Sequence, residues 1–218
     1  MKENEIQDEL VSIRSLMERS SKFISLSGLS GILAGIYALI GAAFAYYIIY
    51  GSQPDESGHR IRYKVEIARG FLYGGNSDSM APTLLSIALL VLIVSICTGI
   101  ILTNRKAKRK GQPIWGSTSK MLLFNMAVPL VSGGFLILVL IYRGHYGIVA
   151  PASLIFYGLA LVGAGNFTFT DVKYLGLCEI VLGLIAACLP GYGLLFWAIG
   201  FGVLHIVYGS IMHFKYDR

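Results

Sequence analysis

The sequence predicts an all-α integral membrane protein with six transmembrane helices in an antiparallel bundle, and three observations carry that prediction. Hydrophobic residues fill 55% of the 218 positions and charged residues only 14%, against about 25% in an ordinary soluble domain. Six apolar segments approach the roughly 20 residues that a helix needs to cross a bilayer. The last four segments are joined by very short turns, which force neighbouring helices to run antiparallel. A soluble globular enzyme, a disordered chain and a secreted disulfide scaffold are excluded.

The predicted transmembrane domain occupies residues 23–214. A charged segment, residues 1–22, precedes the first apolar run, and it lacks the short basic start and apolar core of a signal peptide. We therefore expect the first apolar run to be retained as a span. The six spans cover about 23–50, 82–103, 118–142, 148–165, 172–189 and 193–214, and residues 215–218 form a short tail.

The distribution of Lys and Arg predicts the orientation of the bundle. Thirteen basic residues fall on the side that holds both termini, and five fall on the other side, so both termini should be cytoplasmic. The strongest determinant is a basic cluster in the short loop after the second span. Such a cluster also attracts anionic lipid headgroups, by about 1 kcal/mol for each basic residue. A specific lipid contact is the alternative, and the absence of interleaved aromatics gives nucleic acid no support. The cluster comprises Arg105, Lys106, Lys108, Arg109 and Lys110.

Two segments outside the spans have patterns of their own. In the N-terminal segment, Ile6, Leu10, Ile13 and Met17 form an apolar stripe at helical spacing. This predicts an amphipathic helix on the membrane surface or against the bundle, with self-association through the stripe as the alternative. The outer loop, residues 51–81, contains an alternating apolar and polar run typical of a short strand. We expect it to cap the outer end of the bundle.

One glycine pattern recurs in three of the spans. The stretches GLSGILAG, GLCEIVLG and GVLHIVYG each begin and end with glycine, seven positions apart, and share an isoleucine between them. Small residues on one helix face let backbones approach closely, which is how membrane helices associate. The pattern predicts packing seams and self-association of the chain. The seam residues are Gly28, Gly31, Gly35, Gly176, Gly183, Gly202 and Gly209.

The variable position of this pattern holds Gly31 in the first span, Glu179 in the fifth and His205 in the sixth. Glu179 lies about 15 Å from the outer end of its span and His205 about 18 Å from the outer end of its own, at 1.5 Å per residue. The two spans are antiparallel neighbours, so a hydrogen-bonded pair at mid-membrane is predicted. Intramembrane ionisable residues are costly and usually mark function. Two interpretations stay open: a neutral structural tie, or a proton or substrate site.

The third span contains a second polar feature. Pro129 has no N–H to donate to the carbonyl of Asn125, so a kink is predicted there, and Gly133 and Gly134 loosen the helix further. Broken helices line many transporter sites, whereas a kink absorbed by packing is the simpler interpretation. Tyrosines could add polar tips to such a site or act as interfacial anchors. These tyrosines are Tyr157, Tyr174 and Tyr208.

Two stretches resemble known bacterial membrane proteins. The run LGLCEIVLGLIAACLPGYGLLFWAIGFGVLHIVYGSIM, from Leu175 to Met212, resembles the helical hairpin of HdeD-like small membrane proteins. The run RSSKFISLSGLSGILAGIYALIG resembles uncharacterised small bacterial membrane proteins with six helices. These resemblances imply a multi-pass protein of the bacterial inner membrane with a link to stress, and they bring no catalytic residues.

The sequence contains no HExxH, GxSxG, Walker or CxxC motif, and no cofactor or metal site is predicted. The leading hypothesis is a non-enzymatic inner-membrane protein with a structural, regulatory or stress-related role, associating through its glycine seams. The alternative is a small proton-linked transporter or channel that uses Glu179 and His205, with Asn125 and Tyr208 beside them and the Pro129 kink as a gate. A third hypothesis is an intramembrane enzyme that modifies lipid.

Overall fold

The computed structural model describes residues 27–50, 81–109 and 115–216, and 90% of them are helical, with no strand among them. The predicted N-terminal helix, the predicted strand of the outer loop and Lys110 lie outside the described residues. The helices are α2 (Gly28–Tyr50), α4 (Ala81–Arg109), α5 (Ser117–Tyr142), α6 (Val149–Ala164), α7 (Thr170–Cys188), α8 (Gly193–Trp197) and α9 (His205–Tyr216), with a 3-10 turn at Tyr146–Ile148.

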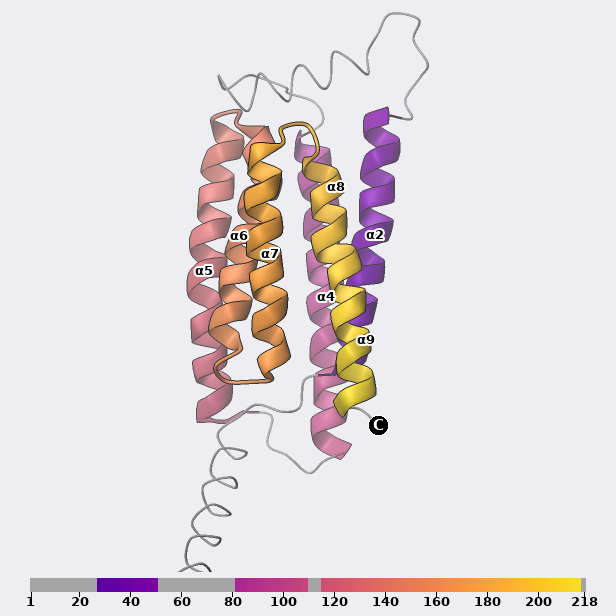
Figure 1. Ribbon diagram of the computed structural model, residues 1–218, viewed down its shortest axis with the longest axis vertical. Helices are drawn as coiled ribbons and strands as arrows, with labels where there is room; N and C mark the ends of the chain where they lie inside the picture. The colour runs from indigo at the N-terminus through magenta and orange to yellow at the C-terminus, as the bar shows by residue number, and fades with distance from the viewer. Residues whose placement is uncertain (1–26, 51–80, 110–114, 217–218) are drawn as a thin grey trace, which may run out of the picture.

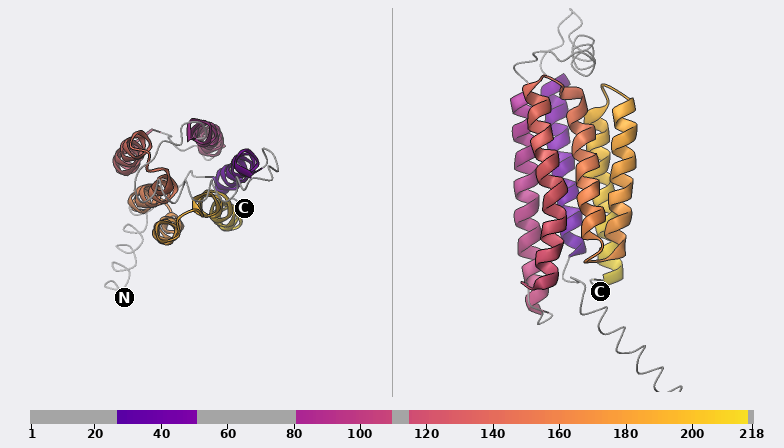
Figure 2. Two further views of the ribbon diagram at one scale, coloured as in Figure 1. Left: turned by 90° about the horizontal axis from the view of Figure 1, so that it is seen from above. Right: turned by 90° about the vertical axis from the view of Figure 1, so that its left-hand side faces the viewer.

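The helices stand side by side along one direction (Figures 1 and 2). Helix α2 lies between α4 and α9, and α6 lies between α5 and α7. The two groups meet where α7 contacts the last span and where α6 contacts α8. The bundle therefore consists of two triplets, each built around one central helix.

Five of the described helices are long and apolar enough to cross a membrane. They are α2, α4, α5, α6 with the turn before it, and the continuous segment Gly193–Tyr216. Helix α7 is the sixth predicted span, and it carries Asp171, Lys173 and Glu179 within 19 residues. The outer helices α4 and α5 expose large apolar side chains such as Leu90, Phe124 and Phe135. Such surfaces suit a lipid environment.

The prediction that the basic cluster lies in a loop after the second span is wrong for four of its five residues. Helix α4 continues to Arg109, so Arg105, Lys106, Lys108 and Arg109 belong to its last turns. Two effects explain the longer helix. Lys and Arg have high helix propensity, and cations are favourable near a helix C-terminus because of the helix dipole.

The last span is a helix in three parts, which the sequence did not predict. Helix α8 leads into a π-helix over Ala198–Leu204, and α9 continues from His205. A π-helix bonds each carbonyl five residues ahead, which widens the turn, and it often occurs at functional positions. Gly200 and Gly202 lie within this segment and are buried.

Glycines bring α2 and the last span into backbone contact. A Cβ atom placed on Gly35 would lie 2.6 Å from the carbonyl oxygen of Gly202 and 2.7 Å from Cγ1 of Ile206. Helices α6 and α7 cross in the same way. A Cβ atom on Gly158 would lie 2.6 Å from the oxygen of Gly176 and 2.7 Å from Cγ1 of Ile180. Neither crossing leaves room for a side chain at its centre.

The two crossings also match at glycines away from their centres, and the matching helices run in opposite directions. Gly209 faces the N–H of Ile32, as Gly183 faces the N–H of Ile155. Gly28, at the start of α2, lies against His213 near the end of α9, and Gly31 lies against Gly209. The start of α2 and the end of α6 are at the same end of the bundle (Figure 1), so one crossing is an inverted copy of the other.

Helix α5 continues through Pro129 without interruption. The side-chain amide of Asn125 donates to the carbonyl of Met121, 2.8 Å away on the same helix. Gly133 lies under the ring of Phe156 on α6, whereas a Cβ atom on Gly134 would meet no described atom within 4 Å. After Pro129, α5 thus packs on α6 at Gly133 and has open space at Gly134; a gate at Pro129 stays a prediction.

The glycine crossings can be tested by adding one methyl group. We expect Gly35→Ala and Gly158→Ala each to destabilise the folded protein by about 1–3 kcal/mol, the usual cost of overpacking, because the new Cβ meets backbone. Gly134→Ala on α5 is the matched control and should leave stability unchanged or slightly higher. Thermal unfolding of the purified variants in detergent measures the difference. Equal midpoints for Gly35→Ala and Gly134→Ala would contradict the close crossing.

Candidate functional site

Glu179 lies at the middle of α7 and is fully buried. Neither of its carboxyl oxygens has a hydrogen-bond partner among the described residues. Buried polar groups are nearly always hydrogen bonded, and a buried charge without partners costs several kcal/mol. This carboxyl group is therefore a feature of the bundle that packing alone does not explain.

His205 begins α9 directly after the π-helix and is buried beside Glu179. Its Nδ1 atom lies 3.0 Å from the carbonyl oxygen of Gly200, and its Nε2 atom lies 2.8 Å from the hydroxyl of Tyr157 on α6. A carbonyl oxygen only accepts, so Nδ1 carries the hydrogen and donates it to Gly200. Nε2 then accepts from the hydroxyl of Tyr157. Both ring nitrogens of His205 are therefore hydrogen bonded while the imidazole is neutral.

The predicted meeting of Glu179 and His205 occurs, but the predicted hydrogen bond does not. The Nδ1 atom of His205 lies 3.5 Å from Oε1 of Glu179. The physical reason is the π-helix, which places the carbonyl of Gly200 closer to Nδ1 and so takes the hydrogen of that atom. A rotation of the imidazole ring would redirect the N–H at Nδ1 from the carbonyl oxygen of Gly200 to Oε1 of Glu179.

The remaining surroundings of Glu179 are tight and largely apolar. A Cβ atom on Gly200 would lie 2.5 Å from Oε2 of Glu179 and would also meet the side chain of Leu154. Three aromatic rings, those of Tyr157, Phe201 and Trp197, lie in sequence beside His205. The ring of Phe201 lies 5.0 Å from that of Tyr157 and 5.2 Å from that of Trp197, measured between centroids.

The other residues predicted for the site divide into two groups. Asn125 is bonded within its own helix, as described above, and does not join Glu179. Tyr208 packs against the same apolar cluster as Tyr157, and its hydroxyl is buried without a hydrogen-bond partner among the described residues. Sequence reasoning missed Gly200. It named Tyr157 as a possible polar tip or interfacial anchor, but it did not place this residue beside Glu179 and His205.

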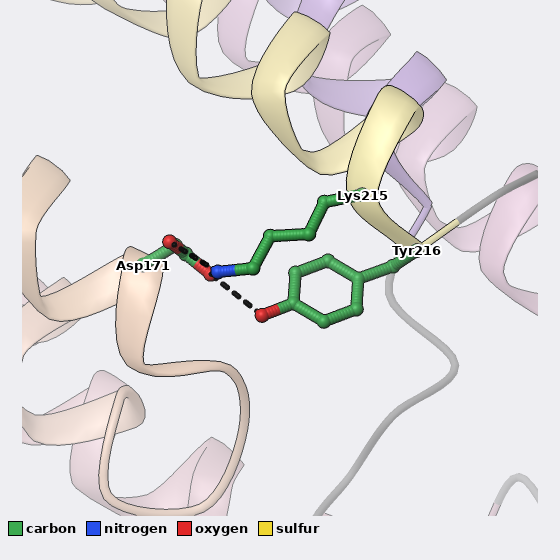
Figure 3. Close-up of polar contacts among 3 residues, drawn as sticks. All are labelled: Asp171, Lys215 and Tyr216. Carbon is green, nitrogen blue, oxygen red and sulfur yellow. Dashed lines mark hydrogen bonds and ion pairs between the residues drawn. The ribbon is translucent and has the colours of Figure 1, made fainter.

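A second polar cluster lies where α7 begins and α9 ends (Figure 3). Lys215 donates to both carboxylate oxygens of Asp171, at 3.2 and 3.1 Å, and the hydroxyl of Tyr216 donates to Oδ2 at 2.9 Å. The ring of Tyr216 also lies 4.2 Å from that of Phe169. Asp171 thus ties the start of α7 to the end of the segment Gly193–Tyr216, and the middles of these two elements carry Glu179 and His205.

The chemistry open to the central site is proton exchange. It contains one carboxyl group, one imidazole in a defined tautomer and one hydroxyl donor, and imidazole is the side chain best suited to pass a proton at neutral pH. Within the described ranges, no group of three or more His, Cys, Asp or Glu residues could hold a metal ion. The site thus presents a single proton-binding carboxyl group with a relay attached to it.

The bond between Tyr157 and His205 is testable. Tyr157→Phe removes the donor to Nε2 and leaves a buried acceptor unpaired, which costs about 1–3 kcal/mol. Tyr174→Phe is the matched control, because Tyr174 is 64% exposed on α7. We expect thermal unfolding in detergent to show the loss in the first variant only. Nitrogen NMR of labelled histidine should show the Nδ1–H tautomer of His205 in the wild type and a mixture in Tyr157→Phe. Identical behaviour of the two variants would contradict the assignment.

Comparison of the chain with family models, with curated proteins and with solved structures found no match. The resemblance of Leu175 to Met212 to HdeD-like hairpins stays a prediction, as does that of the first span to small bacterial membrane proteins.

Proposed function

We propose that this chain is a multi-pass protein of the bacterial inner membrane that couples the movement of a small cation to that of a proton, with Glu179 as the exchangeable proton site. All six predicted spans cross the membrane in this proposal, and both termini are cytoplasmic. The observation that carries it is the fully buried carboxyl group of Glu179 without a hydrogen-bond partner among the described residues, adjacent to His205.

Membrane insertion is supported by the five apolar helices and by the positions of the basic residues. Lys106 at the end of α4 lies 6.0 Å from the ring centroid of Phe169, close to the cluster of Asp171 and Lys215. The basic end of α4 and the end of α9 are therefore at the same end of the bundle, while Arg143 lies at the opposite end, where α5 closes. This distribution agrees with a cytoplasmic face rich in Lys and Arg.

Labelling of single cysteines tests the orientation. In a background without Cys97, Cys178 and Cys188, the exposed residues Lys108 and Arg143 are each replaced by cysteine. In intact cells with a permeabilised outer membrane, a membrane-impermeant maleimide should label Arg143→Cys and spare Lys108→Cys. Inverted membrane vesicles should give the reverse. Labelling of both positions from the same side would contradict the proposed topology.

The arrangement of the helices supports transport. Many secondary transporters are built from two copies of one unit in inverted orientation, with the substrate site near the midplane between the copies. The crossing of α2 with the last span and the crossing of α6 with α7 are inverted copies. Glu179 and His205 occupy the same position in the two copies, three residues after a seam glycine and four before the next. The pair thus lies where such a transporter binds its cargo.

The charge of the site supports a cation as cargo. Glu179 is its only acidic group, and a carboxylate can hold either a proton or a cation, which is the basis of exchange. The rings of Tyr157, Phe201 and Trp197 lie next to it, and aromatic faces attract cations, organic ammonium ions in particular. An anion would meet no cationic side chain at the centre of the described bundle other than His205.

Flux measurements on proteoliposomes test this function. Vesicles that contain the protein and the pH indicator pyranine receive an inward gradient of Na⁺, K⁺ or tetramethylammonium. In the wild type we expect at least one of these cations to drive protons outward, which the dye reports as internal alkalinisation. Glu179→Gln should abolish the signal to the level of empty liposomes, because the amide keeps the shape but binds no proton.

The control for this experiment is Cys178→Ala, the exposed neighbour of Glu179 on the same helix, which should retain wild-type flux. Thermal unfolding should show that Glu179→Gln remains folded, within about 1 kcal/mol of the wild type, since the carboxyl group makes no hydrogen bond that the amide would break. No cation-dependent proton movement in the wild type would contradict transport.

A structural role is the second candidate, and the glycine crossings favour it. Both crossings bring helix backbones into contact, as they would in a scaffold that associates or braces other membrane components. This candidate gains if the wild type shows no flux and if Glu179→Gln alters stability alone. It assigns the buried carboxyl group a purely architectural task.

A further inference from the structure

Between the central site and the cluster at Asp171 lies a partly polar line of side chains. Tyr157 and Tyr208 pack against one apolar cluster, formed by Leu161, Val172 and Leu175. Tyr208 comes one turn after His205 on α9, and Val172 and Leu175 separate Asp171 from Glu179 on α7. The two carboxyl groups are eight residues apart, which is about 12 Å along the helix axis.

The line begins with a hydrogen bond and continues by packing. The hydroxyl of Tyr157 is hydrogen bonded to His205, and Tyr157 and Tyr208 pack against the same cluster. That cluster includes Val172, the residue after Asp171 on α7, and Asp171 accepts from Lys215 and Tyr216 at the end of α9. The hydroxyl of Tyr208 is buried and has no hydrogen-bond partner among the described residues. A buried hydroxyl without a partner costs about 1–3 kcal/mol, so its presence between two polar sites calls for an explanation.

We propose that Tyr208 and Asp171 extend the site into a proton path, which leads from Glu179 through His205, Tyr157 and Tyr208 to the end of the bundle that holds Asp171, Lys215 and Tyr216. This inference rests on the proposed function, because it supplies the route by which Glu179 exchanges its proton with the cytoplasmic side. The hydroxyl of Tyr208 is the buried link, and Asp171 is the group that collects protons at the entrance (Figure 3).

Proton uptake by Glu179 balances as a chain of single transfers. Nδ1 of His205 gives its proton to Oε1 of Glu179, and a new O–H bond forms there. The hydroxyl of Tyr157 gives its proton to Nε2, and Tyr208 gives its own to Tyr157, through water where the oxygens are apart. Tyr208 regains a proton from the carboxyl group of Asp171, by way of water, and Asp171 takes up one proton from the solution at that end of the bundle. One proton enters, Glu179 becomes neutral and His205 is left as the Nε2–H tautomer. Release runs through the same steps in reverse and restores the Nδ1–H tautomer.

The path can be tested by the rate at which Glu179 exchanges its proton for deuterium. Infrared spectroscopy of the purified full-length protein in detergent detects the C=O band of a protonated carboxyl group, and Glu179→Gln identifies which band belongs to Glu179. After rapid mixing with D₂O, this band shifts as the group exchanges. In Tyr208→Phe we expect its amplitude to be unchanged and its exchange to be slower by about tenfold or more, the scale on which a positioned proton donor contributes. Asp171→Asn should slow the exchange as well.

Tyr174→Phe is the matched control, because it removes an exposed hydroxyl from α7, and its exchange should match the wild type. Tyr208→Phe should be as stable as the wild type or more stable, since the hydroxyl that it loses makes no hydrogen bond. A slower exchange therefore reports the path and not damage to the fold.

Two outcomes would overturn the proposal, and they are distinguishable. Wild-type exchange rates in Tyr208→Phe, with the Glu179 band present, would refute the path and leave the proton site intact. Absence of any exchangeable carboxyl band that Glu179→Gln removes would refute the proton site itself, and the path with it.

Discussion

The structure depends on backbone contact between helices at glycine. Apolar side chains gain little by meeting each other in lipid, so membrane helices associate through close packing, which small residues permit. Gly35 against Gly202 and Gly158 against Gly176 bring two pairs of helices to the distance at which a single added methyl group would collide with backbone. Helices α4 and α5 then pack on the central members of these pairs, α2 and α6. The remaining contacts follow from where the glycines put those four helices.

Close packing also explains why a carboxyl group can be buried at the centre. Glu179 follows Gly176 and precedes Gly183, so it lies on the face of α7 that is turned into the bundle. Gly200 leaves its oxygen Oε2 just enough space. A side chain at position 200 would displace the carboxyl group. The glycines thus create the burial that gives the carboxyl group its chemical character.

Much of this could be predicted from the sequence, because apolar length and glycine spacing act locally. The repeat GxxxIxxG predicted seams in α2, α7 and α9, and the short turns predicted that Glu179 and His205 would meet. It was harder to predict which helices pack together. The sequence around Gly158 keeps only part of the repeat, and yet Gly158 lies at the centre of the crossing of α6 with α7. The π-helix could not be predicted, because apolar length and glycine spacing do not distinguish it from an α-helix. Its consequence, the bond from His205 to Gly200 in place of Glu179, was therefore missed.

The inverted copies differ in the polarity of their side chains, and this difference places polar groups on only one side of the central site. Positions that correspond in the two crossings can be matched through Gly35 with Gly158 and through Gly202 with Gly176. By this match the counterparts of Tyr157, Tyr208 and Asp171 are Ala34, Leu182 and Trp197. Tyr157 and Asp171 belong to the crossing of α6 with α7, and Tyr208 belongs to the last span. Each of these polar residues has an apolar counterpart in the other copy. The frame is thus nearly symmetric, whereas the polar groups lead from Glu179 toward one end only. A scaffold has no need of such a difference, but a protein that loads a proton from one side depends on it.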